Sequence, residues 1–270
     1  MITYRATLDV PAHTLRTVTR WLTTHRRRTD DRPWQRAATP RAQALLVLRW
    51  FKNATRVHLL ARDAGISLAT AYRYLHEALD VIAAHAATLP EVLAAGRAEQ
   101  WPFVCLDGTL IPTTALRGPR SPSGAEAWYS GKHHGYGGNI QVVCDPSGYP
   151  VWVSPVTPGS SHDITAARTH ALPALYRGAR DGIVALADKG YHGAGGGIMH
   201  IRRLPKGREP DPDAVCRNKL IMALRAPAER GNALLKATWP VLRRVTLDPN
   251  RITPIAAAAL VLLHLQRGTR

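Results

Sequence analysis

The chain has 270 residues and a mass of 29.5 kDa, of which 45% are hydrophobic and 20% charged. This composition excludes a mostly disordered chain, and the length allows one large domain or two smaller ones. Lys and Arg number 36 against 19 Asp and Glu, which gives a formal net charge of +17 that is shared by both halves of the chain. Because arginine matches phosphate geometry, the first partner to expect is a nucleic acid, although an arginine-rich genome would produce the same excess.

The cysteines and the N-terminal residues indicate whether the chain is expected inside or outside the cell. Cys105, Cys144 and Cys216 are far apart and form no CxxC pair, which argues against a disulfide framework or a zinc knuckle. The N-terminal residues show no apolar segment of the kind found in signal peptides, and the longest apolar run, 255–265, is too short to cross a bilayer. We therefore expect a cytoplasmic protein.

The first hundred residues have helical periodicity. Apolar residues recur at helical spacing around residues 15–22 and 45–51, and two further helical segments follow between residues 56 and 86. The polar stretch 24–40 ends in Pro40 and indicates a linker or basic loop. Because the composition changes near residue 98, we predict an all-α N-terminal domain over residues 1–98.

Residues 56–79 have the pattern of a helix-turn-helix. Gly65 suits a tight turn, and Ser67 is a good cap for the helix that follows. In that helix the predicted inward stripe comprises Leu68, Ala71, Leu75 and Leu79, and the predicted outward face comprises Ala69, Thr70, Arg73, His76 and Glu77. From this region we take Ser67, Thr70, Arg73 and His76 as DNA-binding candidates. The alternative is an ordinary helical hairpin.

Residues 99–270 alternate between strand and helix patterns. The segment PFVCLDGTLIP predicts a buried strand that ends at Asp107, and NIQVVCD with YPVWVSPV predicts a hairpin. Helices are expected over 163–175, 217–245 and 254–266, and Pro227 should kink or begin the middle one. Between the first two helices, DGIVALADKGYHG predicts another buried strand. The order predicts an α/β domain with a mixed sheet and flanking helices.

Three acidic residues stand out in this second region. Asp107 and Asp188 end apolar runs and are followed closely by glycines, and Glu229 is the only carboxylate between Asp213 and Asp248. Three converging carboxylates would repel one another without cations, and hard oxygen ligands favour Mg²⁺ or Mn²⁺. Two such ions could promote in-line displacement at a phosphodiester. Taken singly, each Asp could instead be a cap or turn residue, and Glu229 could pair with Arg225 along a helix.

From about Leu45 to Leu265 the chain resembles DDE-type insertion-sequence transposases, in the bacterial branch related to the Harbinger transposases. The resemblance rests on the helix-turn-helix and on the segments VCLDGTLIP, YSGKHHGYGGNIQVVCDPSGYPVWVS, PGSSHD, LADKGYHG and RAPAERGNALLKATWPVL. It implies a ribonuclease H-like catalytic domain over residues 99–270. It also implies that Asp107, Asp188 and Glu229 are catalytic and bind the metal ions, and that Lys132 lies near DNA.

The resemblance implies a bacterial, nucleoid-associated transposase that binds terminal inverted repeats, cuts DNA and transfers the strand. It implies double-stranded DNA as partner and at least a homodimer in the active complex. In the second region we add His133, Arg225, Arg230 and Lys236 to the DNA-binding candidates, although His133 could be a loop residue. The alternatives are a stand-alone metal-dependent nuclease, or an inactive transposase that acts as a DNA-binding regulator.

Asp163 is the rival of Asp188 for the second catalytic position. It follows His162, and the two resemble a pair of metal ligands. Asp163 also opens a helical segment, so its context favours an N-cap or first-turn residue. Asp188 closes an apolar strand that could hold it rigidly beside Asp107, and we therefore favour Asp188.

Overall fold

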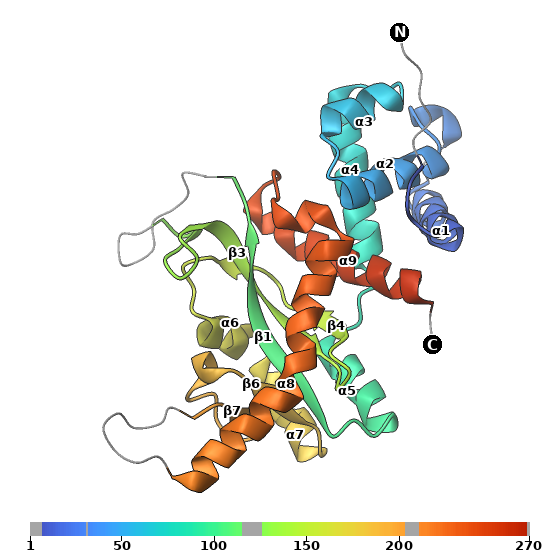
Figure 1. Cartoon of the computed structure of the whole chain (residues 1–270). Helices are drawn as coiled ribbons and strands as arrows, with labels where there is room; N and C mark the ends of the chain where they lie inside the picture. The colour runs from blue at the N-terminus through green and yellow to red at the C-terminus, as the bar shows by residue number, and fades with distance from the viewer. Residues whose placement is uncertain (1–6, 31, 115–125, 203–210, 269–270) are drawn as a thin grey trace. The chain divides into compact units, whose positions relative to one another are not determined.

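The computed structural model describes residues 7–30, 32–114, 126–202 and 211–268 (Figure 1). The chain divides into two compact units. The first, here called the helical unit, comprises Met1–Ala86, Lys236–Arg243 and Pro254–Arg270, and the second, the sheet unit, comprises Ala87–Leu235 and Arg244–Thr253. Residues 87–98, which the sequence analysis assigns to the N-terminal domain, lie in the sheet unit.

The helical unit is built from the four N-terminal helices together with a returning C-terminal segment. Its elements are α1 (Ala12–Arg28), η1 (Pro33–Gln35), α2 (Pro40–Asn53), α3 (Val57–Asp63), α4 (Leu68–Ala83), η3 (Pro240–Arg243) and most of α9 (Ile252–Arg267). The expected linker over 24–40 is shorter than predicted, because α1 continues to Arg28. Thr39 caps α2 by accepting a hydrogen bond from the Ala42 amide at 3.2 Å, and Pro40 fits the first helical turn.

Helices α3 and α4 lie where the helix-turn-helix pattern predicts two helices, but the inward and outward faces of α4 differ from the prediction. Gly65 adopts φ 65° in the turn, and the Ser67 hydroxyl accepts a hydrogen bond from the Thr70 amide at 3.1 Å. Leu68, expected inside, is 47% exposed because it lies in the first turn, and Tyr74 is buried instead. Glu77, expected on the outer face, accepts hydrogen bonds from Arg36 at 2.6 and 3.0 Å, so it belongs to the internal packing of this unit.

The sheet unit contains one sheet of seven strands among the described residues, in the order β2-β3-β1-β6-β7, with β4 and β5 also paired to β3. The pairs β1–β3 and β3–β4 are antiparallel, whereas β1–β6 and β6–β7 are parallel. This confirms the predicted mixed α/β sheet. The strands are β1 (Phe103–Pro112), β2 (Tyr129–Ser130), β3 (Gly135–Cys144), β4 (Pro150–Val153), β5 (Thr157–Pro158), β6 (Val184–Ala187) and β7 (Ile198–His200).

Strand β1 does not end at Asp107, as the sequence analysis expects, but continues to Pro112. Residues 103–105 pair with 184–186 of β6, and residues 105–112 pair with β3. Asp107 therefore lies where the parallel neighbour has ended and the antiparallel neighbour continues. The polar residue after the apolar run marks the end of one strand pairing and not the end of the strand.

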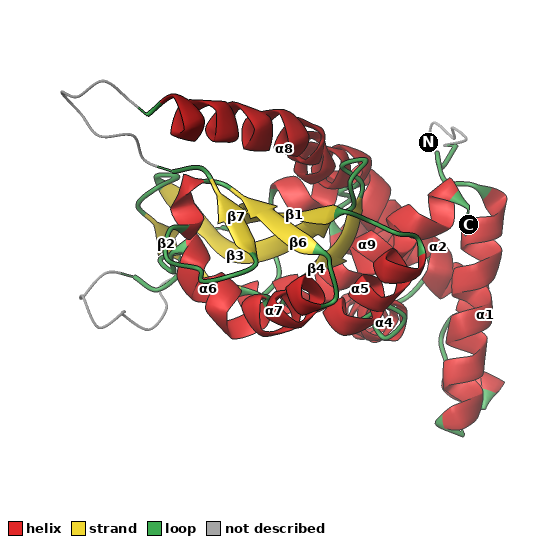
Figure 2. Cartoon of the chain, turned by 90° about the horizontal axis from the view of Figure 1, so that it is seen from below, coloured by secondary structure: helices red, strands yellow, loops and turns green. Residues whose placement is uncertain are grey.

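The helices of the sheet unit cover the sheet on opposite faces (Figure 2). α5 (Leu89–Ala98), α6 (Asp163–His170) and α7 (Leu172–Arg180) lie on one face, here called the α6 face, and α8 (Pro212–Thr238) lies on the other, the α8 face. The short helices η2 (Lys189–Tyr191) and η4 (Pro249–Arg251) complete the unit. The helix expected over 163–175 is thus two helices, α6 and α7, with Ala171 between them.

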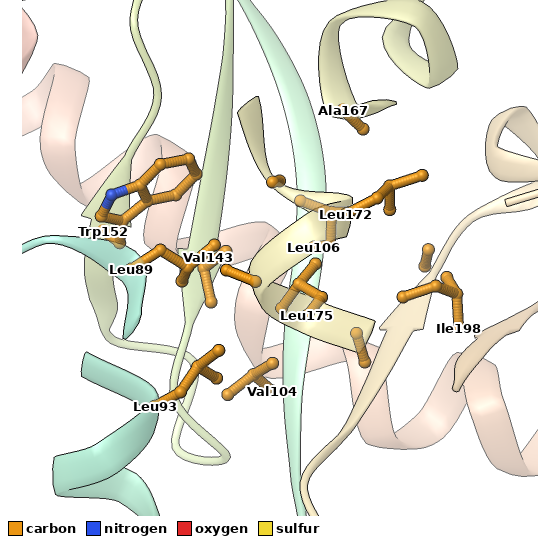
Figure 3. Packing of buried hydrophobic residues seen from close by; sticks show 14 of the residues in the cluster. Leu89, Leu93, Val104, Leu106, Val143, Trp152, Ala167, Leu172, Leu175 and Ile198 are labelled. Atoms are coloured by element: carbon orange, nitrogen blue, oxygen red, sulfur yellow. The ribbon is translucent and has the colours of Figure 1, made fainter. Parts of the chain in front are cut away.

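The main hydrophobic core of the sheet unit lies on the α6 face (Figure 3). Val104 and Leu106 of β1 point into it, together with apolar residues of α5, α6 and α7. Because side chains alternate along a strand, the residue between them, Cys105, points to the α8 face, where its Sγ lies 3.9 Å from the Leu224 carbonyl oxygen. The alternation assigns every side chain of β1 to one of the two faces.

Helix α8 begins and ends earlier than predicted. It runs from Pro212 to Thr238 and includes Pro227 in its interior, so Pro227 does not begin a helix. At the middle of the helix the Gly148 turn, with φ 84°, lies directly against Pro227. None of the helices in the described ranges is long and apolar enough to cross a membrane.

Candidate functional site

The sheet places Asp107 and Asp188 at equivalent positions of two neighbouring parallel strands. Cys105 pairs with Leu186, and two residues further along, Asp107 and Asp188 occupy the next positions on the same face. Leu186 and Asp188 alternate with Ala185 and Ala187, which belong to the core on the α6 face. Both aspartates therefore leave the sheet toward the α8 face. Asp188 also caps η2, because its Oδ1 accepts a hydrogen bond from the Gly190 amide at 2.8 Å.

Asp107 is half-buried, and α8 supplies two of its neighbours. Its Oδ2 accepts a hydrogen bond from Asn232 Nδ2 at 2.9 Å, and its Oδ1 accepts one from the Gly108 amide at 3.0 Å. The buried Arg225 guanidinium stays 3.9 Å from Oδ1. Burial raises the pKa of Asp107, and the charges of Asp188 and Asp163 raise it further, although Arg225 and the Gly108 hydrogen bond oppose this. Negative charge therefore accumulates here without full compensation.

Glu229 is not brought together with the two aspartates. The residues of α8 that face the sheet include Arg225, Ala228 and Asn232, whereas Glu229 is exposed beside this row. Within the described ranges, no group of three or more His, Cys, Asp or Glu side chains is close enough to hold a metal ion. Of the other basic candidates, Arg230 is exposed on α8, and Lys236 lies in the helical unit.

A second polar cluster lies on the α6 face of the sheet, centred on Asp163. Asp163 Oδ2 accepts a hydrogen bond from Lys132 Nζ at 2.8 Å, and its Oδ1 accepts one from Asn139 Nδ2 at 2.8 Å. Its side chain is 16% exposed. Asp163 is the first residue of α6, after the N-cap residue His162, and the hydrogen bonds of its carboxylate go to these two side chains. Its position in the first helical turn agrees with the expectation, but its role is to bind the Lys132 ammonium.

Gly108 separates the two clusters. A Cβ atom at this position would collide with Asp163 Oδ1 and lie 3.1 Å from Gln141 Nε2. The glycine after Asp107 thus leaves room for the Asp163 carboxylate against the backbone of β1. The hydrogen bonds continue along β3, because Gln141 Nε2 donates to Asn139 Oδ1 at 3.1 Å and the Tyr191 hydroxyl donates to Gln141 Oε1 at 2.6 Å.

Sequence reasoning did not single out Asn139, Gln141 or Asn232. Two polar residues at alternate positions of the apolar strand NIQVV would have indicated a polar row on one face of β3. Asn232 follows Arg225 by seven positions, which places both on one side of a helix. Each pattern shows that two polar residues share one face, but the sequence does not show which element that face of β3 or α8 contacts.

A pocket of about 510 Å³ opens beside Lys132. Lys132, His133 and His162 lie on its wall with polar backbone and hydroxyl groups, so its lining can accept an anionic or hydrogen-bonding ligand. The full lining is Leu110, Tyr129, Ser130, Gly131, Lys132, His133, Asn139, Gly159, Ser160, Ser161, His162 and Asp163.

On α4, the predicted DNA-binding residues differ in how accessible they are. Arg73 is exposed, and its guanidinium lies 5.8 Å from the ring centre of Tyr74. Ser67 and Thr70 are bonded to each other through their hydroxyls at 2.9 Å, and the His76 ring stacks with Tyr72. Ser67 and Arg73 are thus exposed, whereas Thr70 and His76 are half-buried.

The donors at the Asp107–Asp188 pair suit a hard divalent cation. They are two carboxylates on neighbouring strands and the side-chain carbonyl oxygen of Asn232, which is buried and has no hydrogen-bond partner among the described residues. Oxygen ligands of this kind bind Mg²⁺ or Mn²⁺, and a cation would balance the charge that raises the pKa of Asp107.

Comparison with known protein families supports this assignment. Residues 106–264, more than half of the chain, match the family of DDE superfamily endonucleases. The matched range contains both aspartates and all of α8. Searches of curated proteins and of solved structures gave no match. The chain therefore belongs to the DDE superfamily of endonucleases.

Proposed function

We propose that this protein is a DNA transposase of a bacterial insertion sequence, in the branch related to the Harbinger transposases. The observation that carries the proposal is the placement of Asp107 on β1 and of Asp188 directly after the end of its parallel neighbour β6, in a DDE endonuclease domain. The net charge of +17 supports a polyanionic substrate. In this proposal the sheet unit is a ribonuclease H-like nuclease that cuts DNA at the element ends and joins them to a target.

In the proposed site, Asp107 and Asp188 hold divalent cations, and Glu229 completes the ligand set from α8. A pair of divalent ions, when bound, would activate the attacking oxygen and stabilise the leaving oxygen. Glu229 lies four positions after Arg225 and three before Asn232, so it is about one helical turn from each of these sheet-facing residues. Arg225 keeps part of the negative charge of Asp107 balanced.

The helical unit would bind the terminal inverted repeats. α4 follows a tight turn at Gly65, and it exposes Arg73, which is the geometry of a helix that enters a major groove. Arg73→Ala should weaken specific DNA binding by about 1–3 kcal/mol if the guanidinium contacts a guanine. Fluorescence anisotropy with matched and scrambled repeat DNA measures this loss, and an unchanged affinity would show that α4 is not the recognition helix.

The decisive experiment measures cleavage and strand transfer with DNA that carries the element's own ends, in Mg²⁺ and in EDTA. Asp107→Asn, Asp188→Asn and Glu229→Gln should each abolish Mg²⁺-dependent cleavage while DNA binding persists. Asp213→Asn is a matched control, because Asp213 is an exposed carboxylate in the first turn of the same helix. Substantial cleavage by one of the three variants would remove that residue from the site.

The products separate transposase from the two alternatives. Joined products indicate a transposase, whereas cleaved but unjoined ends indicate a stand-alone nuclease. Specific binding without cleavage would indicate a DNA-binding regulator. We also expect two chains per pair of DNA ends, because joining requires both ends in one complex, and analytical ultracentrifugation of the DNA complex measures this stoichiometry.

A further inference from the structure

Asn232 is the α8 side chain that bonds directly to Asp107. Its Nδ2 donates to Asp107 Oδ2 at 2.9 Å, a stronger contact than the 3.9 Å approach of Arg225. Its carbonyl oxygen, Oδ1, is buried and has no hydrogen-bond partner among the described residues. A buried carbonyl oxygen without a partner costs stability, so its persistence next to a cluster of carboxylates needs an explanation.

The chemistry of the two groups fixes which end of the amide faces which neighbour. An ionised carboxylate can only accept hydrogen bonds, so the NH₂ end of Asn232 must face Asp107 and the carbonyl oxygen must face away from it. Because the two amide atoms share one carbon, the carbonyl oxygen remains close to Asp107. A neutral oxygen in this position resembles the side-chain carbonyl ligands that proteins offer to Mg²⁺ and Mn²⁺.

A second buried asparagine on the same helix provides an internal comparison. Asn218 lies fourteen positions earlier and bonds at both ends to Arg202: its Nδ2 donates to the backbone carbonyl, and its Oδ1 accepts from the backbone amide, each at 2.9 Å. Asn218 is thus satisfied by the protein alone. Asn232 has only its donor end satisfied, and its free end is the one that can bind a cation.

We propose that Asn232 belongs to the metal-binding site, orienting Asp107 through its amide nitrogen and supplying a neutral oxygen ligand through its carbonyl. This inference rests on the proposed metal-dependent function. In this proposal α8 supplies two metal ligands, the Glu229 carboxylate and the Asn232 carbonyl oxygen. Asn232 is a positioning residue for Asp107 and a ligand of the same ion.

The test measures Mn²⁺ binding to the full-length protein by calorimetry and the melting temperature with and without Mn²⁺. Asn232→Leu removes both ends of the amide and should weaken Mn²⁺ binding by about tenfold or more. Asn232→Asp keeps an oxygen ligand but places a second carboxylate against Asp107. It should therefore melt at a lower temperature in EDTA and show a larger Mn²⁺-induced rise in melting temperature than the wild type.

Asn218→Leu and Asn218→Asp are the matched controls. Both should lower the melting temperature in either buffer while the Mn²⁺ affinity stays within about twofold of the wild type. If Asn232→Leu is folded and binds Mn²⁺ as tightly as the wild type, the inference is wrong. If Asn232→Leu does not fold, an Mn²⁺-induced rise in Asn232→Asp no larger than that of the wild type overturns it equally.

These outcomes are separable from a failure of the proposed function. A wild-type chain that binds no Mn²⁺ and cuts no DNA contradicts both proposals. A wild-type chain that binds Mn²⁺ and cuts DNA, with Asn232→Leu unaffected in both, contradicts only the role of Asn232.

Discussion

The aspartates on the two faces of the sheet, Asp163 and Asp107, have different hydrogen-bond and charge partners. On the α6 face, the Asp163 carboxylate is bonded at both oxygens, to the Lys132 ammonium and the Asn139 amide. On the α8 face, Asp107 has a neutral amide at one oxygen, a backbone amide and a guanidinium 3.9 Å away at the other, and a second carboxylate on the neighbouring strand. Among the described residues, only Asp163 has a cation within hydrogen-bonding distance.

The difference indicates which carboxylate is structural and which is available for chemistry. A carboxylate that is already paired with an ammonium gains little from a metal ion, because the metal would have to replace that ammonium. A carboxylate whose pKa is raised by burial and by neighbouring acids gains much more, because a cation relieves both effects. By this criterion we propose Asp107 for the reacting site and Asp163 for its support.

The largest effect should appear in the cleavage rate. Asp107→Asn should lower single-turnover cleavage of saturating DNA by on the order of 10³-fold or more, whereas Asp163→Asn should lower it by less than about tenfold. The difference follows because only Asp107 would contact the metal. Rapid-quench kinetics measures both rates. Equal losses in the two variants would mean that both faces belong to one reacting site.

Asp163→Asn should have its main effect on stability. The substitution removes the partner of the Lys132 ammonium and leaves the Asn139 amide with a neutral neighbour. Because the Lys132 side chain is largely exposed, we expect a loss of only about 1–2 kcal/mol in the free energy of unfolding, measured by urea denaturation. The double variant with Lys132→Met should lose less than the sum of the two single variants. Additive losses would show that the pair is not coupled.

Gly108→Ala tests the separation of the two faces. The added Cβ would collide with Asp163 Oδ1, so α6 or its aspartate must shift while Asp107 keeps its place on β1. We expect a loss of about 1–2 kcal/mol in stability with Mn²⁺ affinity changed by less than about threefold. Calorimetry and thermal unfolding of the same sample measure both quantities. A large loss of Mn²⁺ affinity would show that Asp163 acts on the metal.

The smallest effect concerns the metal-free protein. Since burial raises the pKa of Asp107, the folded state binds more protons than the unfolded state just above the usual aspartate pKa, and stability falls as pH rises through this window. Asp107→Asn should therefore melt roughly 2 °C higher than the wild type in EDTA at neutral pH. At a pH below the usual aspartate pKa, where Asp107 is protonated in both states, the gain should disappear. A lower melting temperature at neutral pH would mean that Arg225 fully compensates the charge.

The sequence allows the sheet and the two aspartates to be predicted, because strand patterns are local. The apolar runs before Asp107 and Asp188 are short, and each ends in an aspartate that stands out in the sequence. The polar cluster around Asp163 could not be predicted in the same way. Lys132, Asn139 and Asp163 come from a loop, a strand and a helix, and only the tertiary fold brings them together.

Helix α8 shows a different limit of sequence analysis. Its helical pattern is clear, but which residues face the sheet depends on rotation about the helix axis. Predicting from charge favours Glu229 as the inward residue, whereas the structure turns Arg225 and Asn232 inward and leaves Glu229 exposed. A rotation of less than one quarter of a turn separates these alternatives, and no local propensity fixes it.

Two glycines determine how close α8 lies to the sheet. A Cβ at Gly231 would come within 2.6 Å of the Gly148 carbonyl oxygen and 2.7 Å of Cys144 Sγ, so helix and hairpin turn meet with no side chain between them. This close contact restricts which residues can replace Gly231 during evolution. Any larger residue at Gly231 would lift the helix and displace Arg225, Glu229 and Asn232 together, so substitution of this one glycine would inactivate a protein that retains every acidic residue.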